Sequence, residues 1–336
     1  MKPKHYTIPI FIPELACPFQ CVYCNQKKIS GQQEVPSEKE IIKSIEDHLS
    51  TIDYRNNEVE LGFFGGNFTG IPMEEQEKYL KLVQPYIRQG KIKNIRLSTR
   101  PDNINQEILY LLLLNQVETI ELGAQSMDDE VLKASRRGHS SEDTVKAAKL
   151  IQNNGFRLGI QMMIGLPGDS FEKTLYTAGK IADMEADDAR IYPCLVIKGT
   201  KLEDWYHKGK YDALSLEEAV IQTKEVVKIF ENDEVNIIRI GLHPSEGLCS
   251  GEELIAGPYH PSFRELVLTE FWNDLFQPLY RKHYRRRIKI HVPGSELNVA
   301  IGHQSKNKKA LMEFYDEVQI LPDEKIMGRT FYVDYY

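Results

Sequence analysis

Residues 117–168 read VETIELGAQSMDDEVLKASRRGHSSEDTVKAAKLIQNNGFRLGIQMMIGLPG, and this stretch predicts the fold class. A strand-like apolar run over 117–123 precedes a segment with apolar residues at helical spacing over 141–154. A second strand-like run follows over 156–163. A strand, a helix and a strand in this order predict a βαβ unit with parallel strands. We expect Ser141 to begin the helix, with Thr144 three residues on as a weak capping partner.

The same alternation continues toward both ends of this stretch, so that six or seven strands are expected in one α/β domain of residues 1–250. The expected strands are 6–12, 59–64, 92–98, 117–123, 156–163, 189–193 and 236–242. The expected helices are 37–50, 74–88, 106–114, 141–154, 170–184 and 215–230. Ser37 and Glu40 form a capping box at the first of these helices. The pattern predicts a parallel sheet covered by crossover helices, either open or curled into a barrel.

The last part of the chain changes character, because the alternation is lost after Gly251. We expect residues 251–336 to form a small C-terminal α+β appendage that packs on the barrel. Its expected parts are a helix over 261–280, a strand over 288–292, a short helix near 306–315, and strands near Val318 and Phe331.

Composition narrows the class of protein. The 336 residues are 41% apolar and 27% charged, which is typical of a globular chain with a full core. The net charge of −7 gives no general attraction to nucleic acid, although residues 281–289 form one dense basic segment. The longest apolar stretch, 108–114, is far shorter than the ~20 residues that span a bilayer. A soluble cytoplasmic protein with no membrane contact is therefore expected.

Three of the five cysteines, Cys17, Cys21 and Cys24, fall within eight residues, whereas Cys194 and Cys249 stand alone. Such clustering is not a disulfide framework and indicates metal ligation in a cytosolic chain. The spacing Cys-x3-Cys-x2-Cys suits an iron–sulfur cluster that has one iron without a protein ligand. A zinc site and three unligated core thiols remain as alternatives, although structural zinc usually takes four protein ligands. Cys194 and Cys249 are expected to be small core residues.

Several motifs follow expected strands directly, and parallel strands bring their carboxyl ends to one edge of the sheet. We therefore expect these motifs to ring one opening. They are the cysteine segment 17–24, Gly65-Gly66-Asn67-Phe68-Thr69, Ser98-Thr99-Arg100-Pro101-Asp102, Gln125-Ser126 and Gly165-Leu166-Pro167-Gly168.

Cys17-Pro-Phe-Gln-Cys21-Val-Tyr-Cys24, with an aromatic residue before the third cysteine, resembles the cluster motif of radical S-adenosylmethionine (radical SAM) enzymes. The resemblance implies a partial (β/α)6 TIM-like barrel, a 4Fe–4S cluster held by Cys17, Cys21 and Cys24, and bound S-adenosylmethionine. It further implies a reductant such as flavodoxin or ferredoxin, and a 5′-deoxyadenosyl radical that takes hydrogen from the substrate. The residues that it implies for cofactor binding are Tyr23, Gly65, Gly66, Asn67, Ser98, Arg100, Gln125, Arg137, Ile164 and Gly165. His139, next to this set, is more often a structural histidine than a proton carrier.

Across nearly the whole chain the sequence is similar to the group related to the catalytic subunit of Elongator, on the blocks 98–102, 121–126 and 190–200. It has no counterpart of that subunit's acetyltransferase domain or of its lysine-rich N-terminal segment. Bacterial relatives of this kind include enzymes of 7-deazaguanine salvage, so the resemblance implies a small-molecule substrate, with queuine and a queuine lyase reaction as the named candidate. An Elongator-like tRNA-modifying enzyme and a non-catalytic metal-binding scaffold are the alternatives.

Polar residues that alternate toward the expected opening are candidates for substrate contacts. Glu14 stands out among them, since a carboxylate accepts two hydrogen bonds from an amidine-like base edge, although a solvent-exposed glutamate is the plainer interpretation. The other candidates are Gln161, Arg190, Tyr192, Lys198, Arg239 and His243. No residue of the chain is assigned a catalytic role beyond these contacts.

Overall fold

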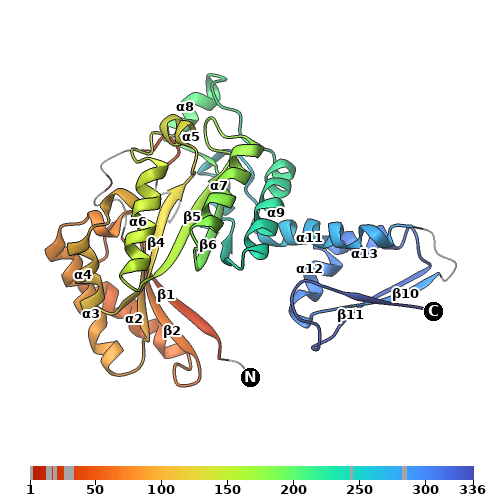
Figure 1. The fold of residues 1–336 in the computed structure, drawn as a ribbon, viewed down its shortest axis with the longest axis horizontal. Helices are drawn as coiled ribbons and strands as arrows, with labels where there is room; N and C mark the ends of the chain where they lie inside the picture. The colour runs from red at the N-terminus through yellow and green to blue at the C-terminus, as the bar shows by residue number, and fades with distance from the viewer. Residues whose placement is uncertain (1–2, 13–16, 18–20, 26–33, 243–244, 282–285) are drawn as a thin grey trace. The chain divides into compact units, whose positions relative to one another are not determined.

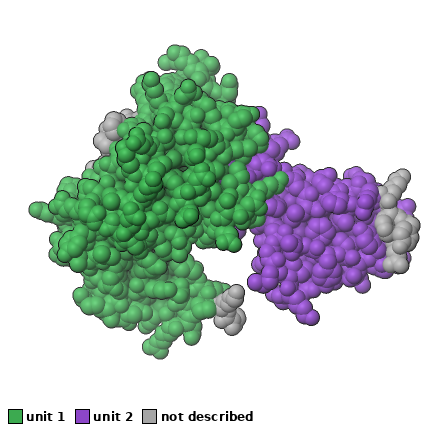
Figure 2. Space-filling model, in the orientation of Figure 1, with its two compact units in different colours: residues 1–215, 228–259 green, residues 216–227, 260–336 purple. Residues whose placement is uncertain are grey.

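The computed structural model describes residues 3–12, 17, 21–25, 34–242, 245–281 and 286–336. It contains two compact units (Figure 2), one of residues 1–215 with 228–259 and the other of residues 216–227 with 260–336. No helix within the described ranges is long and apolar enough to cross a bilayer.

The first unit is built on a parallel sheet of seven strands (Figure 1). In spatial order the strands are β1 (His5–Phe11), β2 (Glu58–Phe64), β3 (Asn94–Thr99), β4 (Val117–Gln125), β5 (Arg157–Ile164), β6 (Asp188–Pro193) and β8 (Asn236–Ile240). The spatial order follows the chain order, and β1 and β8 are the two edges. The sheet curls into a partial barrel, so the expected α/β class with parallel strands is confirmed.

A helix lies in the chain between each pair of successive strands, and the first five of these helices cover the outer face of this sheet. They are α2 (Glu38–Thr51), α3 (Met73–Arg88), α4 (Gln106–Leu114), α6 (Ser141–Asn153), α7 (Phe171–Asp183) and α9 (Leu216–Asn232). All six expected helices are confirmed to within a few residues. The sequence did not predict α5 (Asp129–Ala134), α8 (Lys201–His207), α10 (Glu246–Cys249), or the short strands β7 (Val196–Ile197) and β9 (Leu254–Ala256).

The two faces of the sheet differ in chemistry, because successive side chains of a strand point to opposite faces. Residues such as Ile8, Leu61, Ile120 and Ile160 are buried on the helix-covered face. Burial of these apolar side chains provides most of the stability of the unit. The residues that alternate with them face the inside of the barrel and include many polar and charged side chains, as described below.

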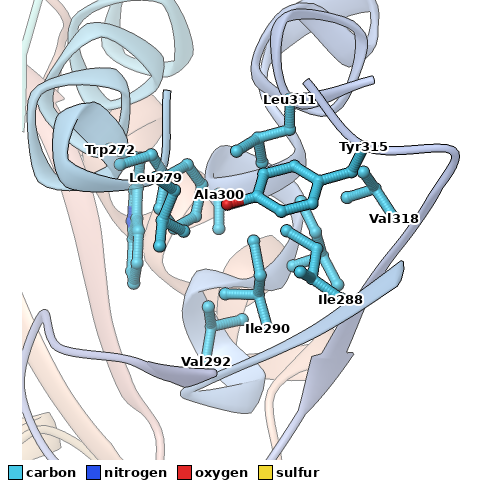
Figure 3. Close-up of a cluster of buried hydrophobic side chains, with 11 residues drawn as sticks. Trp272, Leu279, Ile288, Ile290, Val292, Ala300, Leu311, Tyr315 and Val318 are labelled. Carbon is cyan, nitrogen blue, oxygen red and sulfur yellow. The ribbon is translucent and has the colours of Figure 1, made fainter. Parts of the chain in front are cut away.

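The second unit has its own apolar core, shown in Figure 3, around the fully buried Trp272 of α11 (Phe263–Phe276). This core also packs a three-stranded sheet and two short helices. These elements are β10 (Arg287–Val292), β11 (Glu317–Pro322), β12 (Tyr332–Tyr335), α12 (Leu297–Ile301) and α13 (Lys306–Leu311). The expected mixture of helix and strand is confirmed, and α12 was not predicted.

Helix α6 begins at Ser141 as expected, but its N-cap differs from the expectation by one residue. Ser140, not Ser141, is the N-cap: its hydroxyl accepts a hydrogen bond from the Asp143 amide at 3.2 Å, and the Asp143 carboxylate accepts one from the Ser140 amide at 2.8 Å. Thr144 was the wrong partner because the capping box joins Ser140 to the residue three positions on, which is Asp143. Ser141 instead donates its hydroxyl to Asp129 at 3.2 Å on the surface.

This geometry distinguishes two adjacent serines. Ser140→Ala removes a cap and should lower the free energy of unfolding by about 1 kcal/mol. Ser141→Ala removes an exposed contact and should change it by less than about 0.5 kcal/mol. Urea denaturation followed by circular dichroism measures both. Equal effects, or a larger effect at Ser141, would contradict the assigned cap.

Candidate functional site

A cavity of about 970 Å³ lies inside the curled sheet of the first unit. Side chains from all seven strands line it, together with the cysteine segment. It therefore extends from the carboxyl ends of the strands, where Gly65 and Gln125 lie, to His5 at the beginning of β1. Its size is at the upper end of the ~300 to 1,000 Å³ typical of small-molecule sites.

Cys17, Cys21 and Cys24 all line this cavity. The cysteine segment is anchored at Val22, which is fully buried. The Val22 amide donates to the Ser135 carbonyl at 3.2 Å, and the Val22 carbonyl accepts from the Leu202 amide at 2.7 Å. The otherwise unpredicted helices α5 and α8 therefore hold this segment against the barrel. Within the described ranges, no three His, Cys, Asp or Glu side chains are close enough together to hold a metal ion.

Arg137 contacts the buried thiol of Cys21. Its Nη1 lies 3.5 Å from the Sγ of Cys21, and its Nη2 donates to the Gly123 carbonyl at 2.6 Å. The buried Nε has no hydrogen-bond partner in the part of the chain that the structure describes. A Cβ on Gly123 would lie 2.8 Å from Nη2, so the absence of a side chain at 123 makes room for the guanidinium. The three thiols and this partly unsatisfied guanidinium line the same cavity. By their chemistry, thiolates are the donors that an iron–sulfur cluster takes, and a guanidinium suits an anionic ligand beside it.

Two further residues at the carboxyl ends of strands depend on an unusual backbone conformation. Gly65 has φ +102°, and a Cβ there would lie 3.1 Å from the Ile12 carbonyl oxygen. Gln125 has φ +68° at an irregularity in the β4–β5 pairing, and its Oε1 accepts from Gln161 Nε2 at 3.1 Å. Gly65, Gln125 and Gln161 all line the cavity.

Other expected site residues also line it, namely Tyr23, Gly66, Ser98, Arg190, Tyr192 and Arg239. Five others do not belong to the described cavity lining: Asn67, Arg100, Ile164, Gly165 and Lys198. Asn67 joins the ends of two strands instead, since its Oδ1 accepts from Thr99 Oγ1 at 2.8 Å and its Nδ2 donates to Asn103 at 2.7 Å. Arg100 pairs with Asp102 at 2.9 Å. Glu14 and His243 lie outside the described residues.

The remaining expected positions have structural contacts. Ile164 is fully buried. Gly165 has φ +71°, and its amide donates to Asp169 Oδ2 at 2.9 Å while its carbonyl accepts from the Tyr211 hydroxyl at 2.6 Å. Lys198 is exposed, and its amide pairs with the Glu253 carbonyl at 3.0 Å. Their expected roles in binding stay predictions.

A buried ion network forms the inner wall of the barrel, and the sequence did not predict it. Arg96 donates to Glu60 at 2.9 Å, to Glu121 at 2.8 Å and to Asp188 at 3.0 Å. Glu121 also accepts two hydrogen bonds from Arg190, at 2.6 and 3.0 Å. All but Arg190 are at most 6% exposed, so the charges compensate one another in the interior.

The sequence carries one signal for this network. Each of three strands contains a charged residue between two apolar ones: Glu60, Arg96 and Glu121. In each strand this charged residue alternates with the buried apolar residues and so lies on the other face of the sheet. A period of two therefore places them on the inner face.

Comparison with known families agrees with the fold. The model of the radical SAM superfamily matches residues 12–181, and the model of a radical SAM C-terminal domain matches residues 186–273. The chain belongs to the radical SAM superfamily. Enzymes of this family use a 4Fe–4S cluster and S-adenosylmethionine and need a reductant.

Several individual proteins are similar to this chain. A tRNA uridine(34) acetyltransferase of Methanocaldococcus infernus is 29% identical over 52% of this chain and 36% of its own length. An uncharacterized protein of Methanocaldococcus jannaschii is 31% identical over 61% of each chain. The solved archaeal Methanocaldococcus infernus Elp3 has the same fold, with a TM-score of 0.66, 21% identity, and coverage of 82% of this chain and 64% of that chain. The chain thus spans only about a third to two thirds of these relatives.

His139 gives a test of the electrostatics beside the site. Burial, together with the positive charges of Arg137 and Arg100, lowers the pKa of His139 to about 4. In the unfolded chain the histidine pKa is ~6.5, so between these values the unfolded state binds a proton that the folded state does not. The stability associated with neutral His139 is therefore present above pH 6.5 and is lost as the pH falls toward 4.

We expect wild type to lose roughly 2 kcal/mol more stability than His139→Gln between pH 7 and pH 5. Denaturation curves at each pH measure the difference. If the free energy of unfolding depends on pH in the same way in both proteins, His139 has the same pKa in the folded and the unfolded chain and the prediction is wrong.

Proposed function

We propose that this chain is a radical SAM enzyme acting on a small molecule inside the barrel, and that queuine, a 7-deazaguanine base, is the substrate of a lyase-type cleavage. The observation that carries the proposal is the cavity of about 970 Å³. Its wall brings Gln161, Arg190, Tyr192 and Arg239 together beyond the cysteine segment. A concave site with a few converging polar groups is typical of small-molecule recognition.

In this proposal Cys17, Cys21 and Cys24 hold the cluster, and Arg137, Gln125 and the Gly65 backbone contact S-adenosylmethionine. When bound, the two cofactors supply a 5′-deoxyadenosyl radical that abstracts hydrogen from the substrate. The protein's own contribution is to orient the reacting groups and to exclude water and other hydrogen donors. The curled sheet and its helices suit this task, because they enclose the cavity on the sides.

A test of the cysteine assignment uses single substitutions. Cys17→Ser, Cys21→Ser and Cys24→Ser should each lose most of the iron from anaerobically prepared protein, because a cluster bound by three thiolates has no spare protein ligand. Cys249→Ser is the matched control and should keep wild-type iron and 5′-deoxyadenosine formation, since Cys249 is exposed, contrary to the expectation of a core residue, and does not line the cavity. Bound zinc without 5′-deoxyadenosine would favour a metal-binding scaffold instead.

A second candidate function is modification of tRNA, which is favoured by the name of the Methanocaldococcus infernus relative. The expected basic segment at 281–289 is described only in part. Arg286 pairs with Asp316 at 2.7 Å and Arg287 with Glu317 at 3.7 Å. Both arginines are more than half exposed, and exposed ion pairs contribute only ~0 to 1 kcal/mol, so the choice between the two candidates falls to the following experiment.

The two candidates differ in what stimulates the reaction. Reduced, anaerobic protein with S-adenosylmethionine and queuine should yield 5′-deoxyadenosine and a smaller deazapurine, detected by chromatography and mass spectrometry. Unmodified tRNA in place of queuine should give only background cofactor cleavage. Cleavage that queuine does not change would discard it as the substrate. Cleavage stimulated by tRNA, with salt-dependent tRNA binding, would establish the alternative.

A further inference from the structure

Two arginines stand side by side on the inner wall of the barrel. Arg190 on β6 and Arg239 on β8 are paired in the register of these neighbouring parallel strands. Both line the cavity. Like charges directly opposite each other on adjacent strands are destabilising unless an opposite charge compensates them.

Arg190 has such compensation. Glu121 accepts from its Nε at 2.6 Å and from its Nη2 at 3.0 Å, so the guanidinium is held by two parallel hydrogen bonds. The same guanidinium lies 5.1 Å from the centre of the Phe64 ring. Glu121 itself is 2% exposed and also accepts from Arg96. Arg190 is therefore fixed in place before any ligand binds.

Arg239 differs from its neighbour. No carboxylate in the described ranges lies within ion-pair distance of it, and its one hydrogen bond runs from Nε to the Gly241 carbonyl at 3.2 Å. Among the described residues, none forms a hydrogen bond or an ion pair with its Nη1 and Nη2 groups, so both are available to a ligand in the cavity. A guanidinium presents such groups as a planar fork that suits oxygen acceptors.

We propose that Arg239, beside the fixed Arg190, binds an oxygen acceptor of the substrate, either a carbonyl oxygen of a purine-like base or a carboxylate. This inference rests on the proposed function, because it takes the cavity as the substrate site. Arginine recognises the carbonyl oxygen of guanine-type bases and the oxygens of carboxylates through the same donors. Bound substrate would also compensate the charge that Arg239 carries beside Arg190.

The test measures binding to the anaerobic holoenzyme with S-adenosylmethionine by calorimetry. Three probes are used: 7-deazaguanine, 7-deaza-2,6-diaminopurine, which has an amino group in place of the carbonyl oxygen, and benzoate as the carboxylate. Arg239→Gln keeps a polar side chain but loses the charge and the fork, and Arg239→Lys keeps only the charge. Arg55→Gln is the matched control, since Arg55 is exposed and does not line the cavity. Equal iron content and melting temperature establish that each variant is folded.

If the substrate is a base, wild type and Arg55→Gln should bind 7-deazaguanine more tightly than the diamino compound. Arg239→Gln should bind 7-deazaguanine roughly 10- to 100-fold more weakly than wild type does and should therefore lose that preference. If the ligand is a carboxylate, benzoate should bind and the deazapurines should not, with a similar loss in Arg239→Gln. That second result supports the arginine assignment and removes queuine as substrate. Arg239→Lys should fall between wild type and Arg239→Gln in either case.

Two results would overturn the inference. One is an Arg239→Gln protein that binds its preferred probe as tightly as wild type does. The other is a wild-type holoenzyme that cleaves S-adenosylmethionine but binds none of the three probes.

Discussion

Arg96 determines how charge is arranged inside the barrel. Its three nitrogens each donate to a different carboxylate, and these carboxylates come from β2, β4 and β6. Removal of one partner of a buried ion pair typically costs ~3 to 5 kcal/mol, because the remaining charge has no solvent to stabilise it. The four strands are therefore held on their inner face by mutual charge compensation, while burial of apolar side chains holds their outer face. A barrel with this interior keeps fixed polar groups around an open volume.

Glycines on the inner face make room for two of the charged side chains around that volume. A Cβ on Gly159 would lie 2.7 Å from Cγ of Glu121, and one on Gly123 would lie 2.8 Å from Nη2 of Arg137. Glu121 on the neighbouring strand β4 and Arg137, which follows α5, occupy the space that larger residues at 159 and 123 would need. Gly159 thereby lets Glu121 reach Arg96 and Arg190, and Gly123 lets Arg137 reach Cys21. Two small residues thus connect the packing of the sheet to the electrostatics of the site.

The sequence predicted the large elements because their signals are local. Period-two and helical spacing located all seven strands of the sheet and six helices, whereas β7 and β9, of two and three residues, are too short to show a period. The ion network depends on pairs that are distant in sequence: Arg96 and Asp188 are 92 residues apart. A strand pattern indicates that Arg96 faces inward, but only the curvature of the sheet brings Asp188 within reach. The same limit applies to Asn67, since its hydrogen bonds to Thr99 and Asn103 depend on how two strands end side by side.

Charge compensation also separates the arginines that stabilise the fold from those suited to bind a ligand. Arg96 and Arg190 are paired with carboxylates inside the barrel, and Arg286 and Arg287 are paired with carboxylates in the second unit. Arg239 and Arg137 line the cavity and contact backbone carbonyls or a thiol instead. A guanidinium that is paired with a carboxylate already forms its strongest kind of hydrogen bond. One that contacts only neutral acceptors gains more binding free energy from an incoming anion or carbonyl oxygen. The two arginines of this second kind lie at different places in one cavity, so the cavity can bind a cofactor carboxylate at one of them and a substrate acceptor at the other.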